Sequence, residues 1–164
     1  MPSEPPDRPT LVVRDGSRIV EAPREDQDVA AQYPAYPDKG AVVDGYRLTI
    51  LSRQGAYGVG DPVRVVHVCE AVAQGTKLYV MGPKPVYAEY VDGEHATAAV
   101  PPGENALAPS AYDGRVVDGP AVDYNYEITE YRFATPGTHT IQWRPKPYAS
   151  NVLRIEVAPD RRPA

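Results

Sequence analysis

Residues 138–157, THTIQWRPKPYASNVLRIEV, determine the fold class that the sequence predicts. Within Thr138–Arg144, aromatic and aliphatic side chains, among them Ile141 and Trp143, alternate with polar ones. This period of two is typical of a strand with one buried face. Asn151–Val157 alternates in the same way, and the prolines between the two segments favour a turn. The stretch therefore predicts a C-terminal β-hairpin with its apolar face, including Trp143, in the core.

The same pattern extends toward the N-terminus as far as Gly45. Tyr46–Leu51 alternates, and Pro62–Ala73 is apolar on both faces, which predicts a central strand. Further strands are predicted at Thr76–Met81, Pro85–Val91, Arg115–Val117 and Asp123–Phe133, the last as one long strand with Tyr124, Tyr126 and Ile128 on one face.

The composition agrees with an all-β chain. The 19 prolines and 13 glycines among 164 residues disfavour long helices, and the length suits one core. We predict a two-sheet antiparallel β-sandwich over residues 42–158. Residues 1–41 are expected to form a Pro-rich mobile tail, a possible small hairpin and an extended surface connection, in which only Arg24–Gln32 suits a helix. Residues 159–164 are predicted to be disordered.

Three segments resemble a known fold. Phe133-Ala-Thr-Pro-Gly137-Thr-His139-Thr-Ile141 resembles the turn and penultimate strand of immunoglobulin-like and fibronectin-type-III-like domains. Ser150–Val157 resembles the final strand of bacterial immunoglobulin-like domains, and Gly60–Val65 resembles an early core strand. The resemblance implies an immunoglobulin-like sandwich, a fold used for adhesion, ligand display and spacing. It departs at His139, where such domains often carry tyrosine, and the two cysteines of antibody domains are absent.

Charge and patterning exclude several classes of function. The net charge is −5 without a Lys/Arg block, so we expect no nucleic-acid partner. No apolar run approaches the roughly 18 residues of a membrane span, so we expect no membrane insertion. A single cysteine and the lack of a signal peptide predict a cytoplasmic protein, with export left open if a signal was trimmed.

Catalytic and metal sites have weak support in the sequence. His67 and Cys69 share one face of a strand at a spacing of about 6.5–7 Å, too far for a thiol–imidazole hydrogen bond. With His139 they form the one candidate set for zinc or copper. Calcium is the other candidate metal, at Asp113, Asp118 and Asp123, although Asp-Gly pairs also make turns. The acidic pairs Glu127–Glu130 and Glu89–Glu94 predict no acid–base geometry.

Tyrosine is the remaining signal. The chain has 12 tyrosines and one phenylalanine, and a ring with a hydroxyl suits sites where one end of the side chain is wet. We predict a non-catalytic binding or protein-interaction module that presents tyrosine-bearing loops, with Tyr87, Tyr90 and Tyr112, to a protein or glycan partner. The alternatives are a core that uses tyrosine in place of phenylalanine, and a metal-binding protein or enzyme using His67, Cys69 and His139. The oligomeric state stays open.

Overall fold

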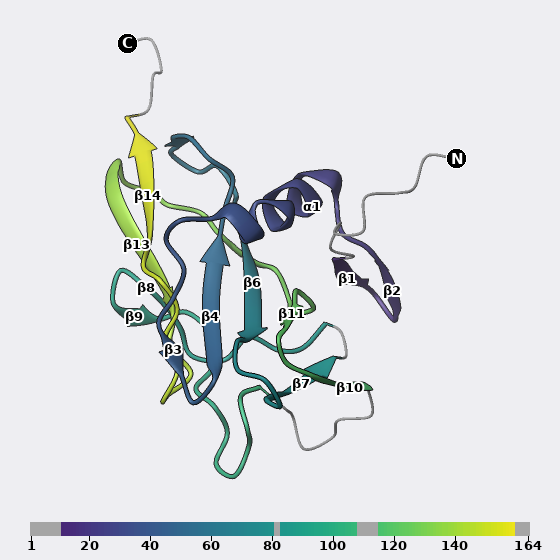
Figure 1. Ribbon diagram of the computed structural model, residues 1–164. Coiled ribbons are helices and arrows are strands. Elements are labelled where there is room, and N and C mark those ends of the chain that lie inside the picture. Colours follow the sequence, from purple (N-terminus) through teal and green to yellow (C-terminus); the bar gives the residue numbers. More distant parts are fainter. Residues whose placement is uncertain (1–10, 81–82, 108–114, 160–164) are drawn as a thin grey trace.

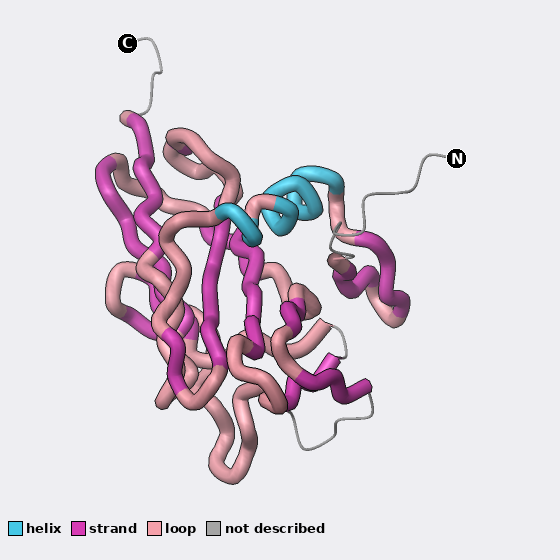
Figure 2. The backbone as a smooth tube through the Cα atoms, viewed as in Figure 1, coloured by secondary structure: helices cyan, strands magenta, loops and turns pink. Residues whose placement is uncertain are grey.

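The computed structural model describes residues 11–80, 83–107 and 115–159, and it shows an all-β chain with one short α-helix (Figures 1 and 2). The first elements are β1 (Val12–Asp15), β2 (Arg18–Glu21), α1 (Arg24–Ala31), the 3-10 turn η1 (Tyr33–Ala35), β3 (Val42–Val43), β4 (Tyr46–Leu51), β5 (Tyr57–Gly58) and β6 (Val63–Ala71). The remaining elements are β7 (Lys77–Val80), β8 (Glu89–Val91), β9 (Glu94–His95), β10 (Arg115–Asp118), β11 (Ala121–Asp123), β12 (Thr129–Tyr131), β13 (Gly137–Trp143) and β14 (Leu153–Ala158).

The first large sheet is built around β6. Its order is β11-β6-β4-β3, and β12 pairs with another stretch of β6. In the β4–β6 ladder, Leu48 lies opposite Cys69 and Ile50 opposite His67. The prediction of a central strand in this segment is confirmed, because β6 has paired neighbours on both sides and is almost entirely buried.

The second large sheet contains the C-terminal hairpin. Its order is β5-β14-β13-β8-β9, and β13 and β14 are antiparallel, with Ile141 opposite Leu153. Ile141, Trp143 and Leu153 are all buried, so the hairpin and the inward direction of Trp143 are confirmed. One feature of this sheet lies outside the prediction: β5, within a segment expected to be a turn, runs parallel to β14.

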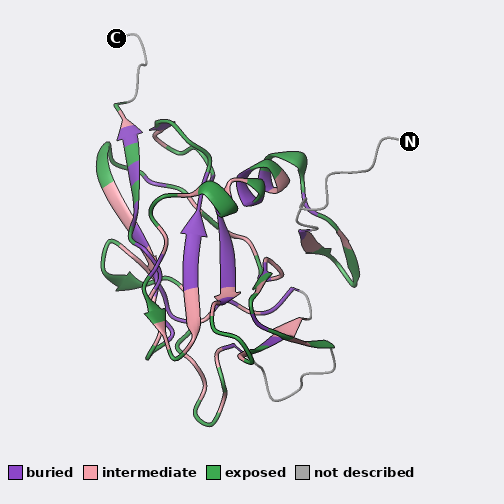
Figure 3. Ribbon diagram, viewed as in Figure 1, coloured by how far each residue is buried: buried purple, intermediate pink, exposed green. Residues whose placement is uncertain are grey.

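One hydrophobic core is shared by the two large sheets. It combines side chains of β4 and β6, such as Ile50 and Val65, with side chains of β13 and β14, such as Trp143 and Ile155. Figure 3 shows β4 and β6, the two largely buried strands of the first sheet, side by side. A smaller pair, β7 with β10, packs Leu78 against the same core.

A second cluster of buried residues covers the opposite face of β6. Val29 and Ala30 of α1 pack there with Val66 and Val68, and Arg64 forms an ion pair with Asp26 at 2.8 Å. The β1–β2 hairpin precedes the helix and stands at the side of the molecule (Figure 1). The helix lies within Arg24–Gln32, the one stretch of the expected surface connection that suits a helix, and its buried side chains include Val29 and Ala30.

The prediction of one long strand over Asp123–Phe133 is wrong. The segment divides into β11 and β12, which pair with different parts of β6. Between them the backbone turns to Lys84: the Lys84 N–H donates to the Asn125 carbonyl, and the Glu127 N–H donates to the Lys84 carbonyl. Tyr126 therefore enters the shared core, whereas Ile128, predicted on the same face, packs on the helix side.

Within the described residues, no helix has the length and apolar character needed to cross a bilayer. Residues 1–10 and 160–164, which were expected to be mobile or disordered, lie outside the described part of the chain.

The buried indole gives a test of the shared core. Trp143→Ala should lower the free energy of unfolding by about 3–5 kcal/mol, because it leaves a large cavity between the sheets. Val122→Ala, at an exposed position, is the control and should change it by less than about 0.5 kcal/mol. Denaturant titration measures both, and a loss below about 1 kcal/mol for Trp143→Ala would contradict the packing.

Candidate functional site

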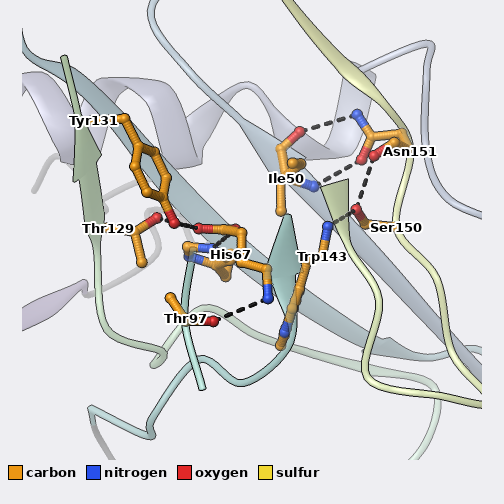
Figure 4. A network of polar contacts seen from close by, with 9 residues as sticks. Ile50, His67, Thr97, Thr129, Tyr131, Trp143, Ser150 and Asn151 are labelled. Carbon is orange, nitrogen blue, oxygen red and sulfur yellow. Dashed lines mark hydrogen bonds and ion pairs between the residues drawn. The ribbon is translucent and has the colours of Figure 1, made fainter. Parts of the chain in front are cut away.

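The most concentrated polar chemistry of the chain is a buried cluster around Glu89 (Figure 4). One carboxylate oxygen, Oε2, accepts a hydrogen bond from His67 Nε2 at 2.5 Å. The other, Oε1, accepts from the hydroxyls of Thr129 and Tyr131, each at 2.5 Å. Three donors thus satisfy a carboxylate that is fully removed from solvent, as a buried charge requires.

The elements that carry this cluster come from both large sheets. His67 is an inward residue of β6, Thr129 and Tyr131 belong to β12, and Glu89 opens β8 in the other sheet. Ala88, just before it, has φ of +59°, in the left-handed region that residues with a Cβ rarely adopt. The turn at Ala88 changes the alternation along the chain and places the Glu89 side chain in the interior.

The charge state of Glu89 follows from these contacts. Burial alone would raise its pKa, but the His67 ring and the two hydroxyls hold the pKa of Glu89 below its usual value. Burial, and then the neighbouring carboxylate, raise the pKa of Tyr131 well above the ordinary value, so its hydroxyl stays a donor. At neutral pH the cluster therefore holds a carboxylate that accepts from the Thr129 and Tyr131 hydroxyls.

A neutral polar contact ties the sheets beside this cluster. The Asn151 side chain accepts from the Ile50 N–H at 2.8 Å and donates to the Ile50 carbonyl at 3.1 Å, which joins the end of β4 to the start of β14 (Figure 4). Ser150 Oγ accepts from the Trp143 N–H at 2.9 Å. These side chains complete backbone pairing where the strands diverge.

A second buried ion pair joins Lys84 to Asp123 at 2.5 Å. The Lys84 ammonium also donates to the Tyr79 carbonyl at 2.6 Å and lies 4.2 Å from the centroid of the Tyr126 ring. Burial raises the pKa of the neighbouring Cys69 thiol to about 12. The thiol is therefore protonated at neutral pH and unsuited to nucleophilic attack or metal ligation.

The structure gives the three candidate zinc or copper ligands different neighbours. His67 contacts Glu89 and the Trp143 ring, Cys69 lies near the Lys84 ion pair, and His139 pairs with Asp92 at 2.7 Å near the surface. The Asp92 carboxylate raises the pKa of His139. Among the described residues, no group of three or more His, Cys, Asp or Glu side chains is placed to hold a metal ion.

The candidate calcium ligands are likewise separated. Asp118 pairs with Lys77 on the surface, and Asp123 pairs with Lys84 in the interior. Asp113 lies outside the described residues.

Two of the three predicted binding tyrosines lie in the described part of the chain. Tyr87 is half-buried. The Tyr90 hydroxyl is hydrogen-bonded to His95 Nε2 at 3.0 Å. The Arg144 guanidinium lies over the Tyr90 ring, 4.0 Å from the ring centroid. Tyr112 lies outside the described residues.

A surface cleft of about 250 Å³ opens where the loop after β4 and the segment after η1 face β14. Tyr36, Asp38, Arg53, Tyr57 and Arg154 are among the residues that line it. The Arg53 guanidinium lies 4.4 Å from the Tyr57 ring centroid. Burial, and then Asp38, raise the pKa of Tyr36. The alternation of apolar and polar residues in β14 predicts that the Arg154 side chain points outward. No pattern in the sequence predicts that Tyr36 and Arg53 lie close to Arg154.

The Glu89 cluster makes a stability prediction. Glu89→Gln should lower the free energy of unfolding by about 3–5 kcal/mol, because an amide has one acceptor oxygen for donors on both sides and leaves a buried group unpaired. Glu94→Gln, on the exposed strand β9, is the matched control and should have little effect. Equal stability of Glu89→Gln and wild type in denaturant titration would show that the Glu89 carboxylate contributes nothing to the free energy of unfolding.

The same cluster predicts a pH dependence. The pKa of Glu89 is lower in the folded than in the unfolded protein, so its contribution is complete above the unfolded value of about 4.3. It should decline as pH falls through the lower, folded value. Unfolding titrations from pH 7 into acid should therefore show the difference between wild type and Glu89→Gln shrinking, and a difference that grows in acid would contradict the assignment.

Cys69 gives a chemical test of the interior. Because its thiol is buried and its pKa is about 12, a thiol-specific reagent at pH 8 should leave the native protein unmodified and label it fully in denaturant. The double variant Val152→Cys/Cys69→Ser, with its thiol at an exposed site, should react at once in the native state. Rapid labelling of native Cys69 would contradict the packing around Lys84.

The chain was also compared with known proteins. The comparison finds no matching family model, no matching curated protein and no matching solved structure. The case for a function therefore depends on the residues of this chain.

Proposed function

We propose that the chain is an immunoglobulin-like β-sandwich that acts as a non-catalytic binding module for a protein or glycan partner. We place its ligand site in the cleft beside β14. The observation that carries the proposal is the distribution of polar groups: Glu89, Lys84, Asp123 and Cys69 are buried, whereas aromatic rings and guanidinium groups line an open cleft.

The fold assignment is supported by two five-stranded sheets that share one core and by a C-terminal hairpin at the centre of one of them. The resemblance of residues 133–141 and 150–157 to immunoglobulin-like domains falls on this hairpin. In such sandwiches the connections between strands, rather than the core, present binding groups.

The composition of the cleft supports a recognition role. Tyrosine and arginine are the residues enriched at the energetic centres of protein interfaces, and Tyr36, Arg53 and Arg154 meet in this cleft. Arg53 is oriented by stacking on Tyr57, which lowers the entropy that it would lose on binding. Within the described residues Arg154 has no ion-pair partner, so its charge is available to a ligand.

The tyrosines expected from the sequence supply a second surface. Tyr90, stacked with Arg144 and bonded to His95, forms an ordered aromatic patch on β8 and β9. This patch is the comparison site for any ligand that the protein proves to bind.

The test uses labelled protein on peptide and glycan arrays, followed by calorimetry of each ligand found. We expect Tyr36→Ala or Arg154→Gln to weaken binding by about 2 kcal/mol or more, the level of an interface hot spot. The melting temperature should be unchanged for Arg154→Gln, whose side chain is exposed, whereas Tyr36 also packs on the helix-side cluster. Tyr90→Ala is the matched variant of the comparison site and should bind as wild type. A ligand lost only in Tyr90→Ala would move the site to β8 and β9, and a protein that binds neither array would refute the proposal.

A further inference from the structure

The edge of the second sheet is open beside the cleft. β5 is the outer neighbour of β14, but it pairs only with Val157 and Ala158. The remainder of β14, from Leu153 to Glu156, is paired on the β13 side alone within the described residues. Open strand edges attract other strands, and proteins usually cover or interrupt them.

The direction of the Arg154 backbone follows from the ladder on its other side. The Thr140 carbonyl accepts from the Asp92 N–H at 2.8 Å, and the Thr140 N–H donates to Asp92 Oδ1 at 2.9 Å. Both main-chain groups of Thr140 therefore face β8. Thr140 lies directly opposite Arg154, so this antiparallel pair is a non-hydrogen-bonded one. The N–H and carbonyl of Arg154 consequently face away from β13, toward the open edge.

The side chains at this edge are complementary to an acidic ligand. Arg154 and Arg53 both line the cleft, and Asp38 is the only carboxylate among its lining residues in the described part of the chain. Arg53 also lies 3.7 Å from the exposed Glu25 carboxylate, which leaves Arg154 as the stronger site for an acidic group. Val152, 38% exposed, lies two residues before Arg154 and adds apolar contact on the same face. In a strand added to β14, the residue opposite Arg154 would point its side chain to the same face, at the distance of a cross-strand ion pair.

We infer that the cleft binds an extended peptide segment with an aspartate or glutamate, which adds to β14 as a strand. The Arg154 N–H and carbonyl pair with the peptide backbone, and the Arg154 and Arg53 guanidinium groups bind the carboxylate. This inference rests on the proposed function and names its partner class: main-chain bonds at the edge give affinity, and the arginines give selectivity. The segment after η1, which carries Tyr36, lines the cleft together with this edge.

The test uses a mixture of acetylated, amidated pentapeptides with glutamate fixed at the third position and the other positions randomised. NMR hydrogen exchange of the ¹⁵N-labelled protein is the main measurement. On saturation, exchange of the Arg154 amide should slow, whereas the Leu153 and Ile155 amides, already directed to β13, should not change. A mixture with lysine at the third position should bind about tenfold more weakly or worse, since a charge-assisted hydrogen bond is lost.

Two controls separate the edge from general charge. N-methylation of the fixed glutamate should abolish protection of Arg154, because the methyl group removes the donor to the Arg154 carbonyl and its bulk keeps the two backbones apart. Arg154→Gln should weaken binding of the glutamate mixture about tenfold or more, whereas Arg18→Gln, an exposed arginine of β2, should not.

Several outcomes would overturn the inference. Unchanged exchange of the Arg154 amide at saturation, or equal binding of the glutamate and lysine mixtures, would exclude acidic strand addition. Protection of that amide without peptide would assign the edge to another segment of the same chain if independent of protein concentration, or to a second copy if not. A glycan ligand from the arrays that needs Tyr36 but leaves Arg154 unprotected would refute the inference while the proposed function stands.

Discussion

The fold depends on a carboxylate that has no access to water. Glu89 lies between the sheets and is tolerated there because His67, Thr129 and Tyr131 satisfy both of its oxygens. A buried carboxylate of this kind adds little net stability over an apolar core, but loss of one of its partners is costly, so it favours one arrangement of strands over others. The cluster therefore fixes β8 against β6 and β12, and with them the register of the second sheet.

Lys84, which follows β7, and Asp123, in β11, are a second set of buried charged groups that must stay paired. Their ion pair, with the Lys84 backbone bonded to residues 125 and 127, interrupts what would otherwise be one strand. This interruption brings Tyr126 into the shared core, where its ring packs on Trp143 at a centroid distance of 4.9 Å. The two buried polar clusters thus lie where β11 and β12 pair with different parts of β6.

The sequence predicts the parts of this structure that follow from local alternation. The hairpin around Trp143 and the central strand β6 need only a period of two and the apolar character of each face. Glu89 was not predicted as a core residue, because the positive φ of Ala88 breaks the alternation just before it. The partners of His67 were missed for a related reason: a single sequence carries no signal for which strand of the opposite sheet faces it. The cleft beside β14 likewise joins Tyr36, Arg53 and Arg154, which are distant in sequence.

The buried clusters also determine where function can reside. The Glu89 carboxylate and the Lys84–Asp123 pair have their partners inside the protein, so they rigidify the sheets and have little capacity left for a ligand. The rigid frame in turn holds β14 with its outer edge open over Leu153–Glu156, since β5 ends its pairing at Val157. A mobile edge would lose entropy on accepting a strand, whereas a fixed one presents its main-chain groups in advance. The buried polar clusters and the proposed peptide site are therefore linked: the clusters order the two sheets, and the ordered sheets present the open edge of β14.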